Sequence, residues 1–191
     1  MERLKWKAGN SLYPLPVVLV SCGDLDGLKN IITLAWVGTI ASDPAMVSIS
    51  VRPERYSHAL IMKNKSFVIN LATKKLIYAL DWCGVKSGRD FDKFKQMKLT
   101  AVKAQKVSAP LIKESPINIE CVIKDVKRYG AHDVFLSEVA AVNADPAFMN
   151  TKTDKFDFMK CKPICYCHGN YYEVGKYLGN FGFSVRKKRS R

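Results

Sequence analysis

The chain has no hydrophobic run long enough to cross a membrane as a helix. Its longest apolar stretches, "LPVVLVSC" and "IITLAWVG", fall far short of the ~18 residues that a membrane-spanning helix needs. The first residues, "MERLKWKAGN", contain no apolar segment of the kind found in secretory signals. We therefore expect a cytoplasmic protein with no membrane partner, whose six cysteines are reduced thiols rather than a disulfide framework.

Several motifs that define binding modules are also missing. The sequence has no G-x-G-x-x-G element, which argues against a Rossmann lobe for a dinucleotide. It has no RNP motif, no recognition-helix pattern and no paired zinc ligands, which argues against nucleic acid as the partner. No repeat or linker interrupts the chain, and 191 residues suit a single domain over residues 1–191.

Positive charge is in excess. The formal net charge is +14, and a basic tail occupies residues 186–191. Such charge attracts an anionic partner, whether nucleic acid, a lipid surface or a phosphorylated cofactor. The alternative is a solvated surface with a frayed end, and charge alone does not choose between the two.

Strand-like patterns dominate the chain. Residues 16–22 form a continuous apolar run, residues 30–38 resume the sheet, and "DPAMVSISV" alternates with a period of two. Residues 66–72 predict another strand, and the long alternating segments on either side of Gly130 predict an antiparallel hairpin. "PICYCHG" adds a short strand, and we expect a helical turn in "YYEVGKYLG".

Two segments have helical spacing. Ser57 is a plausible N-cap for a short helix that ends at Asn64. Residues 74–85 predict a second helix, with an apolar stripe formed by Leu76, Ile77, Leu80 and Cys83. Many strands, few helices and no repeated βαβ order predict a mainly β protein, an antiparallel β-barrel with helical excursions.

The order of motifs in residues 30–71 resembles the flavin reductase-like family. These motifs are "NIITLAWVG", a strand that ends in Ser50, Val51 and Arg52, the helix start at Ser57, and "SFVINL". The resemblance continues through "SGRDFDKF", "LIKESPINIEC" and "GNYYEVGKYLGNFGFSVRKK". It implies an FMN-binding split barrel, in particular of the flavoredoxin branch.

The resemblance places the FMN phosphate near Arg52 and Ser57. Arginine offers a planar set of donors suited to phosphate oxygens, and a helix N-terminus presents free amides. The alternative for Arg52 is a surface ion pair with Glu54. The family likeness also implies that the strand edge at residues 33–36 lines the flavin ring, with its backbone amides near the part that becomes negative on reduction. These four residues are Thr33, Leu34, Ala35 and Trp36; Trp36 either packs against the ring or belongs to the core.

Other candidates are less specific. By resemblance, the strand that carries Asn70 and Leu71 passes beneath the cofactor, and Asn70 bonds the ribityl chain; its alternative is a turn residue at a strand end. His58 either contacts the phosphate or ribityl group or is paired on the surface, and His132 is given no role. The loop that begins Lys86, Ser87, Gly88 has the composition of an anion-binding nest and lies near the cofactor by resemblance. We name no catalytic side chain, because the flavin itself carries the chemistry.

Three cysteines cluster near the end of the chain. In a regular strand, Cys161, Cys165 and Cys167 would share one face, with His168 on the other. A zinc site takes paired cysteines from two turns, and the remaining cysteines are isolated. We interpret these thiols as residues of the barrel core or its lip and predict no metal; a redox or iron-binding role is the alternative.

The resemblance implies an FMN-dependent oxidoreductase of the flavin reductase or flavoredoxin type. Its electrons come from NAD(P)H, which must dock over the flavin, or from an acidic electron-transfer protein attracted to the basic surface. An electron-transfer flavoprotein without NAD(P)H activity is the main alternative, and a basic nucleic-acid-binding protein is the other. The family also implies a homodimer that shares its flavin clefts across a two-fold interface.

Overall fold

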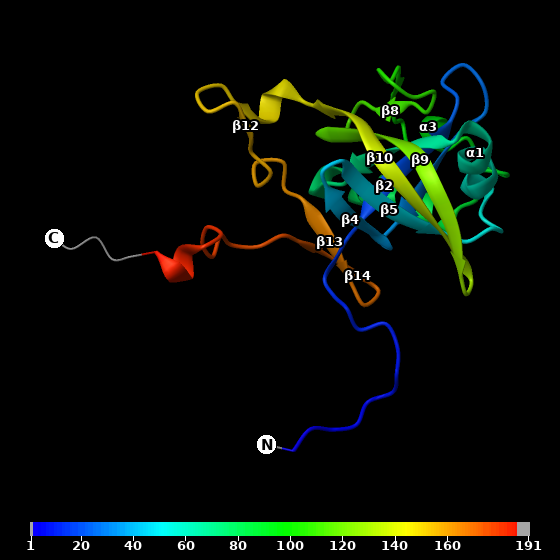
Figure 1. The fold of residues 1–191 in the computed structure, drawn as a ribbon. Helices are drawn as coiled ribbons and strands as arrows, with labels where there is room; N and C mark the ends of the chain where they lie inside the picture. The colour runs from blue at the N-terminus through cyan, green and yellow to red at the C-terminus, as the bar shows by residue number, and fades with distance from the viewer. Residues whose placement is uncertain (1, 187–191) are drawn as a thin grey trace.

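The main body of the protein is one curved antiparallel sheet, seen in the computed structural model that describes residues 2–186 (Figure 1). Its strands are β2 (Val18–Gly23), β3 (Lys29–Leu34), β4 (Val37–Ser42), β5 (Ala45–Val51), β6 (Ser66–Leu71), β9 (Ile117–Tyr129) and β10 (His132–Ala144). They lie in the spatial order β3–β2–β6–β9–β10–β5–β4. The prediction of a mainly β, antiparallel fold is confirmed.

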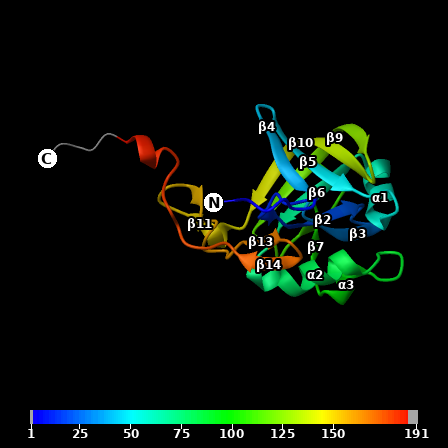
Figure 2. The ribbon, with the colours of Figure 1, turned by 90° about the horizontal axis from the view of Figure 1, so that it is seen from below.

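Shorter elements surround this sheet. The helices are α1 (Tyr56–Asn64), α2 (Ile77–Val85) and α3 (Lys93–Gln96), with 3₁₀ turns η1 (Lys74–Leu76), η2 (Pro146–Phe148) and η3 (Phe183–Val185). The short strands are β1 (Leu15–Pro16), β7 (Ala101–Val102), β8 (Leu111–Ile112), β11 (Met149–Asn150), β12 (Lys155–Phe156), β13 (Ile164–Cys167) and β14 (Asn170–Glu173). The strands β1, β13 and β14 form a small sheet of their own. Figure 2 shows α2 and α3 along one side of the main sheet and α1 at its end.

The β9–β10 hairpin agrees with its alternating sequence. Tyr129 pairs with His132 at the tip, and Gly130 between them has φ 55°, a left-handed conformation that glycine adopts without steric cost. The ladder contains two register irregularities. Bulges of this kind bend a strand and increase its twist, so they help the sheet to curl.

Strand β2 is buried on both faces, which explains its continuous apolar sequence. Leu19 belongs to a core cluster with Leu80 of α2 on one face. Val18 and Val20 belong to a second cluster, which includes Ile61 of α1. Helix α2 therefore covers one face of the sheet at β2, and α1 covers the other face.

The chain turns a corner between β3 and β4. These strands lie at opposite edges of the main sheet, yet only Ala35 and Trp36 separate them in the sequence. The sheet must therefore curl until its two edges approach one another at this point. Residues 30–38 resume the sheet as expected, but in two strands, with a bend at Ala35 and Trp36, because a single straight strand cannot occupy both edges. At the corner, the Ser50 amide donates to the Trp36 carbonyl at 2.9 Å.

The two predicted helices form, with a change at the start of each; the segment predicted as a helix over residues 74–85 is the 3₁₀ turn η1 followed by α2. Helix α1 begins at Tyr56 with Arg55 at the N-cap position, so Ser57 lies inside the first turn and the N-cap prediction is wrong. The apolar stripe of the second helix is confirmed. Its residues Leu76, Leu80 and Cys83 are buried against the first core cluster, with Ile77 partly buried beside them.

Both ends of the described chain extend away from the body (Figure 1). Apolar side chains on these segments are exposed, among them Trp6 near one end and Leu178 and Phe181 near the other. The expected helical turn in "YYEVGKYLG" is wrong, because residues 170–173 continue the sheet as β14 and the helical turn comes later, at η3. Of the basic tail, residues 187–191 lie outside the described part of the chain.

Candidate functional site

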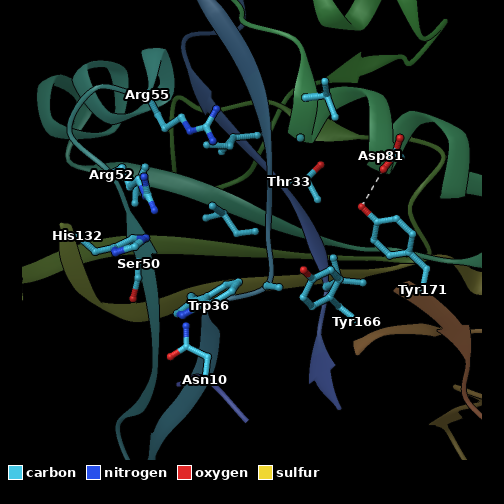
Figure 3. Close-up of a pocket in the computed structure, with 17 residues that line it drawn as sticks. Asn10, Thr33, Trp36, Ser50, Arg52, Arg55, Asp81, His132, Tyr166 and Tyr171 are labelled. Carbon is cyan, nitrogen blue, oxygen red and sulfur yellow. Dashed lines mark hydrogen bonds between the residues drawn. The ribbon is translucent and has the colours of Figure 1, made fainter. Parts of the chain in front are cut away.

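A cavity of about 590 Å³ opens at the corner between β3 and β4, within the size range of small-molecule sites. We call residues 33–36 the β3–β4 corner. The side chains that surround the cavity come from the edge strand β3, from β5 and the segment after it, from α2 and from the small β13–β14 hairpin (Figure 3). The cavity therefore lies where the corner brings the end of β3 beside the end of β5.

The two walls of this cavity differ in charge. Arg52, Arg55 and His132 lie on one side, while Asp81, Tyr166 and Tyr171 lie on the other (Figure 3). The Tyr171 hydroxyl donates to Asp81 Oδ1 at 3.1 Å. Burial, together with this hydrogen bond and the nearby carboxylate, raises the pKa of Tyr171 to about 12. The phenol therefore keeps its proton in neutral solution.

A smaller pocket of about 160 Å³ adjoins the cavity, and we call it the basic pocket. The two share Ile32, Arg55 and Gly84 among their lining residues. Four cationic side chains contribute to its lining: Arg55, Lys86, Arg89 and Lys93. A single carboxylate, that of Glu54, opposes them. The pocket is therefore strongly positive and suited to a small anion.

The N-terminus of α1 opens into the basic pocket. Tyr56 and Ser57, the first two residues of the helix, both line it, and the Arg55 side chain makes no capping hydrogen bond to the first turn. The first amides of a helix have no partner within the helix and carry a partial positive charge. Ser57 Oγ accepts a hydrogen bond from Asn30 Nδ2 at 2.8 Å, which fixes Asn30 beside the helix start. These amides add neutral hydrogen-bond donors to the four cations.

Eleven of the fourteen cofactor-binding residues predicted from the sequence line one of the two hollows. Those that line the large cavity are Thr33, Leu34, Ala35, Trp36, Ser50, Val51 and Arg52, and those that line the basic pocket are Ser57, Lys86, Ser87 and Gly88. Trp36 is partly exposed. Thr33 Oγ1 donates to the Leu80 carbonyl, which ties the corner to α2.

Asn70, Leu71 and His58 line neither hollow. Asn70 is fully buried inside β6, where its amide donates to the Leu19 carbonyl and accepts from the Ile112 amide. The side chain is thus engaged by the protein itself, within a strand rather than in a turn. Leu71 ends the same strand and packs against the second core cluster.

His58 has a carboxylate partner. Its Nε2 lies 2.7 Å from Asp133 Oδ2, and both side chains are mostly buried rather than on the surface. The Arg128 side chain also donates to Asp133. This hydrogen bond lowers the pKa of the Asp133 carboxyl, and burial, which acts in the opposite direction, offsets only part of the effect. The pair holds the first turn of α1 against the start of β10. By contrast, the ion pair between Arg52 and Glu54 is loose, at 3.7 Å between two well-exposed side chains.

Several residues of the site carried no recognisable signal in the sequence. Asp81 belongs to a helix face, Tyr166 and Tyr171 belong to the β13–β14 hairpin, and all three meet the corner only in the folded chain. Arg55 lines both hollows. The only sequence signal that could have identified it as a site residue is its place just before the start of a predicted helix.

The cysteine cluster is divided between β13 and the turn before it. Cys165 and Cys167 are partly buried in β13, but Cys161 lies in the turn before it, so the expectation that all three share one strand face is wrong. Cys161 Sγ lies 2.9 Å from the Phe158 carbonyl. Residues 2–186 contain no group of three or more His, Cys, Asp or Glu side chains that could hold a metal ion. Within the same residues, no helix is both long and apolar enough to cross a membrane.

Comparison with known proteins agrees with this architecture. A family model for the flavin reductase like domain matches residues 10–175. An uncharacterised protein from Pyrococcus abyssi is 37% identical over 150 residues, which cover 78% of this chain and 86% of that protein. The structure is similar to the flavoredoxin of Desulfovibrio vulgaris (Miyazaki F), with a TM-score of 0.89 and 27% identity over 97% of this chain and 100% of the other. A flavoredoxin from Methanosarcina acetivorans gives a TM-score of 0.88 and 26% identity over the same shares. The predicted family resemblance is confirmed.

Proposed function

Because this chain belongs to the flavin reductase-like family, we propose that it is an oxidoreductase that binds FMN at the β3–β4 corner and the adjoining basic pocket. When bound, FMN supplies the redox chemistry by accepting electrons and passing them on. The electron donor in this proposal is NAD(P)H or a redox protein. The observation that carries the proposal is the junction of a roomy cavity with a small cationic pocket, which share Ile32, Arg55 and Gly84.

The residues present fit the two halves of this cofactor. The phosphate is small, carries about two negative charges and needs convergent donors. Arg55, Lys86, Ser87 and the first amides of α1 offer them in the basic pocket, and Arg52 stands at the edge of the adjoining cavity. Gly84 lines both hollows, and its lack of a side chain leaves room between them.

The ring system needs a flat seat and hydrogen-bond donors, because reduction increases its negative charge. The β3–β4 corner offers main-chain groups on one side, with Trp36 and Tyr166 nearby, their ring centroids 6.4 Å apart. These residues bind and orient the ring and restrict water around it. Tyr171, which keeps its proton, and Asp81 face the opposite end of the cavity, where a second molecule would enter.

The direct test is the absorbance spectrum of the purified protein, followed by fluorescence titration of the flavin-free protein with FMN. We expect a flavin spectrum or saturable FMN binding with one site per chain. A protein that neither carries nor binds FMN would overturn the proposal. The alternative of a basic nucleic-acid-binding protein would then be the one to test.

The nature of the electron donor is a separate question. The net charge of +14 favours an acidic protein partner, whose association would slow as salt screens the attraction. Stopped-flow mixing of the FMN-bound protein with NADH and with NADPH distinguishes the candidates. Bleaching of the flavin absorbance supports a nicotinamide-dependent reductase, whereas no bleaching with either supports electron transfer between proteins.

Arg52 gives the first mutational prediction. We expect Arg52→Ala to weaken FMN binding by about 1–2 kcal/mol, the lower part of the range for hydrogen bonds to charged groups, because its side chain is half-exposed. Fluorescence titration measures the change. The matched control is Glu54→Ala, which removes the neighbouring carboxylate and leaves affinity equal or higher. Equal affinity in wild type and Arg52→Ala would exclude Arg52 as a phosphate ligand.

We also propose that the protein is a homodimer. The two extended ends carry apolar side chains that are exposed to solvent in the described part of one chain. Examples are Trp6, Leu178 and Phe181. Burial against a second copy would remove them from water. Light scattering at micromolar concentration should give twice the mass of the 21.5 kDa chain. A monomer that still retains FMN would contradict this prediction without affecting the proposed cofactor.

A further inference from the structure

Helix α2 is apolar on its outer face as well as on its inner face. Leu80 and Cys83 belong to the first core cluster, as expected for a helix that covers a sheet. On the outer side, Tyr78 is 73% exposed and Val85 is 69% exposed, with Trp82 partly buried between them. Their spacing of four and then three residues places these side chains together on one side of the helix. Surface helices ordinarily carry polar residues there, so this face indicates a contact surface.

A residue of the following loop extends this surface. The ring of Phe91 packs edge-on against Trp82, with 5.4 Å between the ring centroids. Lys86 Nζ lies 5.8 Å from the centroid of the Phe91 ring, which places a positive charge at the margin. We call Tyr78, Trp82, Val85 and Phe91 the outer patch. Figure 2 shows α2 and α3 along the margin of the molecule, where a partner can approach the patch.

The outer patch lies beside the cavity at the β3–β4 corner. Val85 belongs to the patch and also lines that cavity, as do Asp81 and Gly84 of the same helix. A protein that covers the patch therefore comes directly beside the proposed seat of the flavin ring. Electrons pass between two cofactors only when these lie close together, so a redox partner must dock at a place of this kind.

The charges around the outer patch favour an acidic partner. Residues 74–96, which include α2 and α3, contain six Lys or Arg residues and three Asp residues. Glu173 adds a fourth carboxylate, since it pairs with Lys74 at 3.0 Å. The surface thus keeps an excess of positive charge, in a chain whose net charge is +14. An apolar centre with a polar rim is the usual anatomy of a protein interface, and a positive field speeds the approach of an acidic protein.

Two other occupants fit this surface less well. In a two-fold contact between copies of this chain, the outer patch would meet itself, and the same cations would face one another. A lipid surface with negative headgroups would attract the cations, but it would repel Asp81, Asp90 and Asp92, which are exposed around the patch. An acidic protein avoids both conflicts, because its carboxylates can lie opposite individual lysines.

We propose that the outer patch is the docking surface for an acidic electron-carrier protein that exchanges electrons with bound FMN. The inference rests on the proposed function and adds to it the class of the partner and the surface that it contacts. In the direction of FMN reduction, two encounters with a reduced one-electron carrier deliver two electrons. FMN takes up two protons from water, and two carrier molecules are left oxidised. A contact of four apolar side chains suits such encounters, because redox partners use small interfaces that separate readily.

The test mixes the FMN-bound protein with a reduced plant-type [2Fe–2S] ferredoxin, an acidic one-electron carrier, and follows the flavin absorbance by stopped flow. The main variant is Tyr78→Glu, which places a carboxylate in the outer patch at an exposed helix position that lines neither hollow. We expect its second-order rate constant to fall at least about tenfold, because the new charge repels the carrier and interrupts the apolar contact. Reduction by dithionite, which needs no docking surface, and FMN affinity should be unchanged.

The matched control is Leu28→Glu. Leu28 is 68% exposed in the turn between β2 and β3 and lines neither hollow, so this variant adds the same charge at another exposed apolar position. We expect it to react with ferredoxin as wild type does. Equal slowing in Leu28→Glu and Tyr78→Glu would show that only the net charge matters and would overturn the inference.

Other results distinguish this inference from the proposed function. If the wild type carries FMN but ferredoxin does not reduce it, the inference is overturned while the flavin site stands. If Tyr78→Glu halves the mass found by light scattering, a second copy covers the patch and the inference is wrong. It is also wrong if ferredoxin does not react and the wild type, but not Tyr78→Glu, sediments with vesicles of phosphatidylserine and phosphatidylcholine.

If the wild type binds no FMN, the proposed function fails, and the surface is tested separately with oxidised flavodoxin, another acidic carrier. The readout is the indole N–H signal of Trp82 in NMR, assigned with Trp82→Phe. A shift at low salt that is lost in Tyr78→Glu supports the docking surface and limits the failure to the flavin. No shift in the wild type overturns the inference as well.

A second variant keeps the test available should Tyr78→Glu not fold. Lys75→Glu reverses the charge of an exposed lysine three residues before Tyr78 and leaves the apolar side chains in place. We expect ferredoxin to reduce this variant more slowly than wild type at low salt, and the difference to disappear at high salt, where the charges are screened. A wild-type rate that does not depend on salt contradicts the inference.

Discussion

Replacing Glu120 by alanine should lower the free energy of unfolding by about 3 kcal/mol or more, the scale expected when a buried charged group with several partners is removed. Glu120 is fully buried in β9. Its carboxylate accepts from the Gln105 amide at 2.9 Å, the Lys106 amide at 2.6 Å and Asn143 Nδ2 at 2.8 Å. It thus holds the loop between β7 and β8 against the main sheet, and alanine would leave all three donors without an acceptor.

Chemical denaturation at neutral pH measures this loss. Glu114→Ala is the matched control, because Glu114 also accepts a main-chain amide, that of Thr100, but is exposed. Because water can replace the hydrogen bonds of this exposed carboxylate, we expect Glu114→Ala to lower the free energy of unfolding by less than about 1 kcal/mol. Similar losses in the two variants would show that the buried carboxylate does not anchor the loop.

The pH dependence gives an independent test of Glu120. Burial by itself raises the pKa of this carboxyl, but the hydrogen bonds from Gln105, Asn143 and Lys106 outweigh it, and the net pKa is lowered from 4.5. A lowered pKa in the folded state stabilises the protein above the unfolded value, and this stabilisation is lost as pH falls through the folded value. The stability difference between wild type and Glu120→Gln should therefore be constant near neutral pH and shrink below about pH 4.5. A difference that does not change on acidification would contradict this.

Gly88→Ala should weaken FMN binding by about 2 kcal/mol, within the range for forcing an extra methyl group into a packed site. A Cβ at Gly88 would lie 2.2 Å from Asn30 Oδ1 and 2.5 Å from its Cγ, far closer than atoms can approach. Asn30 cannot move freely, because it is buried and bonded to Ser57. The loop that carries Lys86 and Ser87 must therefore shift, and the basic pocket loses its shape.

Fluorescence titration with FMN measures the effect, alongside the melting temperature to show that the variant is folded. Gly175→Ala is the control, because a Cβ there meets nothing within 4 Å. We expect it to bind FMN as wild type does. If Gly88→Ala also bound FMN normally while remaining folded, the loop at residues 86–88 would have no part in the site.

The sequence determined much of the local structure, because that information is carried by neighbouring residues. Alternation along β9 and β10 and the glycine between them were enough to predict the hairpin. The uninterrupted apolar run of β2 indicated a buried strand, and the helical stripe from Leu76 to Cys83 indicated the buried face of η1 and α2. The ordered series of motifs also indicated the family, and with it the neighbourhood of Arg52 and residues 33–36.

Only the tertiary structure decided where these pieces meet. The corner at Ala35 and Trp36 follows from closing the two edges of the sheet, and no local pattern encodes which strands become edges. Asp81, Tyr171 and Lys93 belong to three separate elements, each with an ordinary local sequence. Their roles depend on burial and on contacts between distant segments, as do the charge of the basic pocket and the enclosure of Asn70. A one-dimensional pattern records which residues follow one another, whereas desolvation and electrostatic fields depend on which residues surround one another in space.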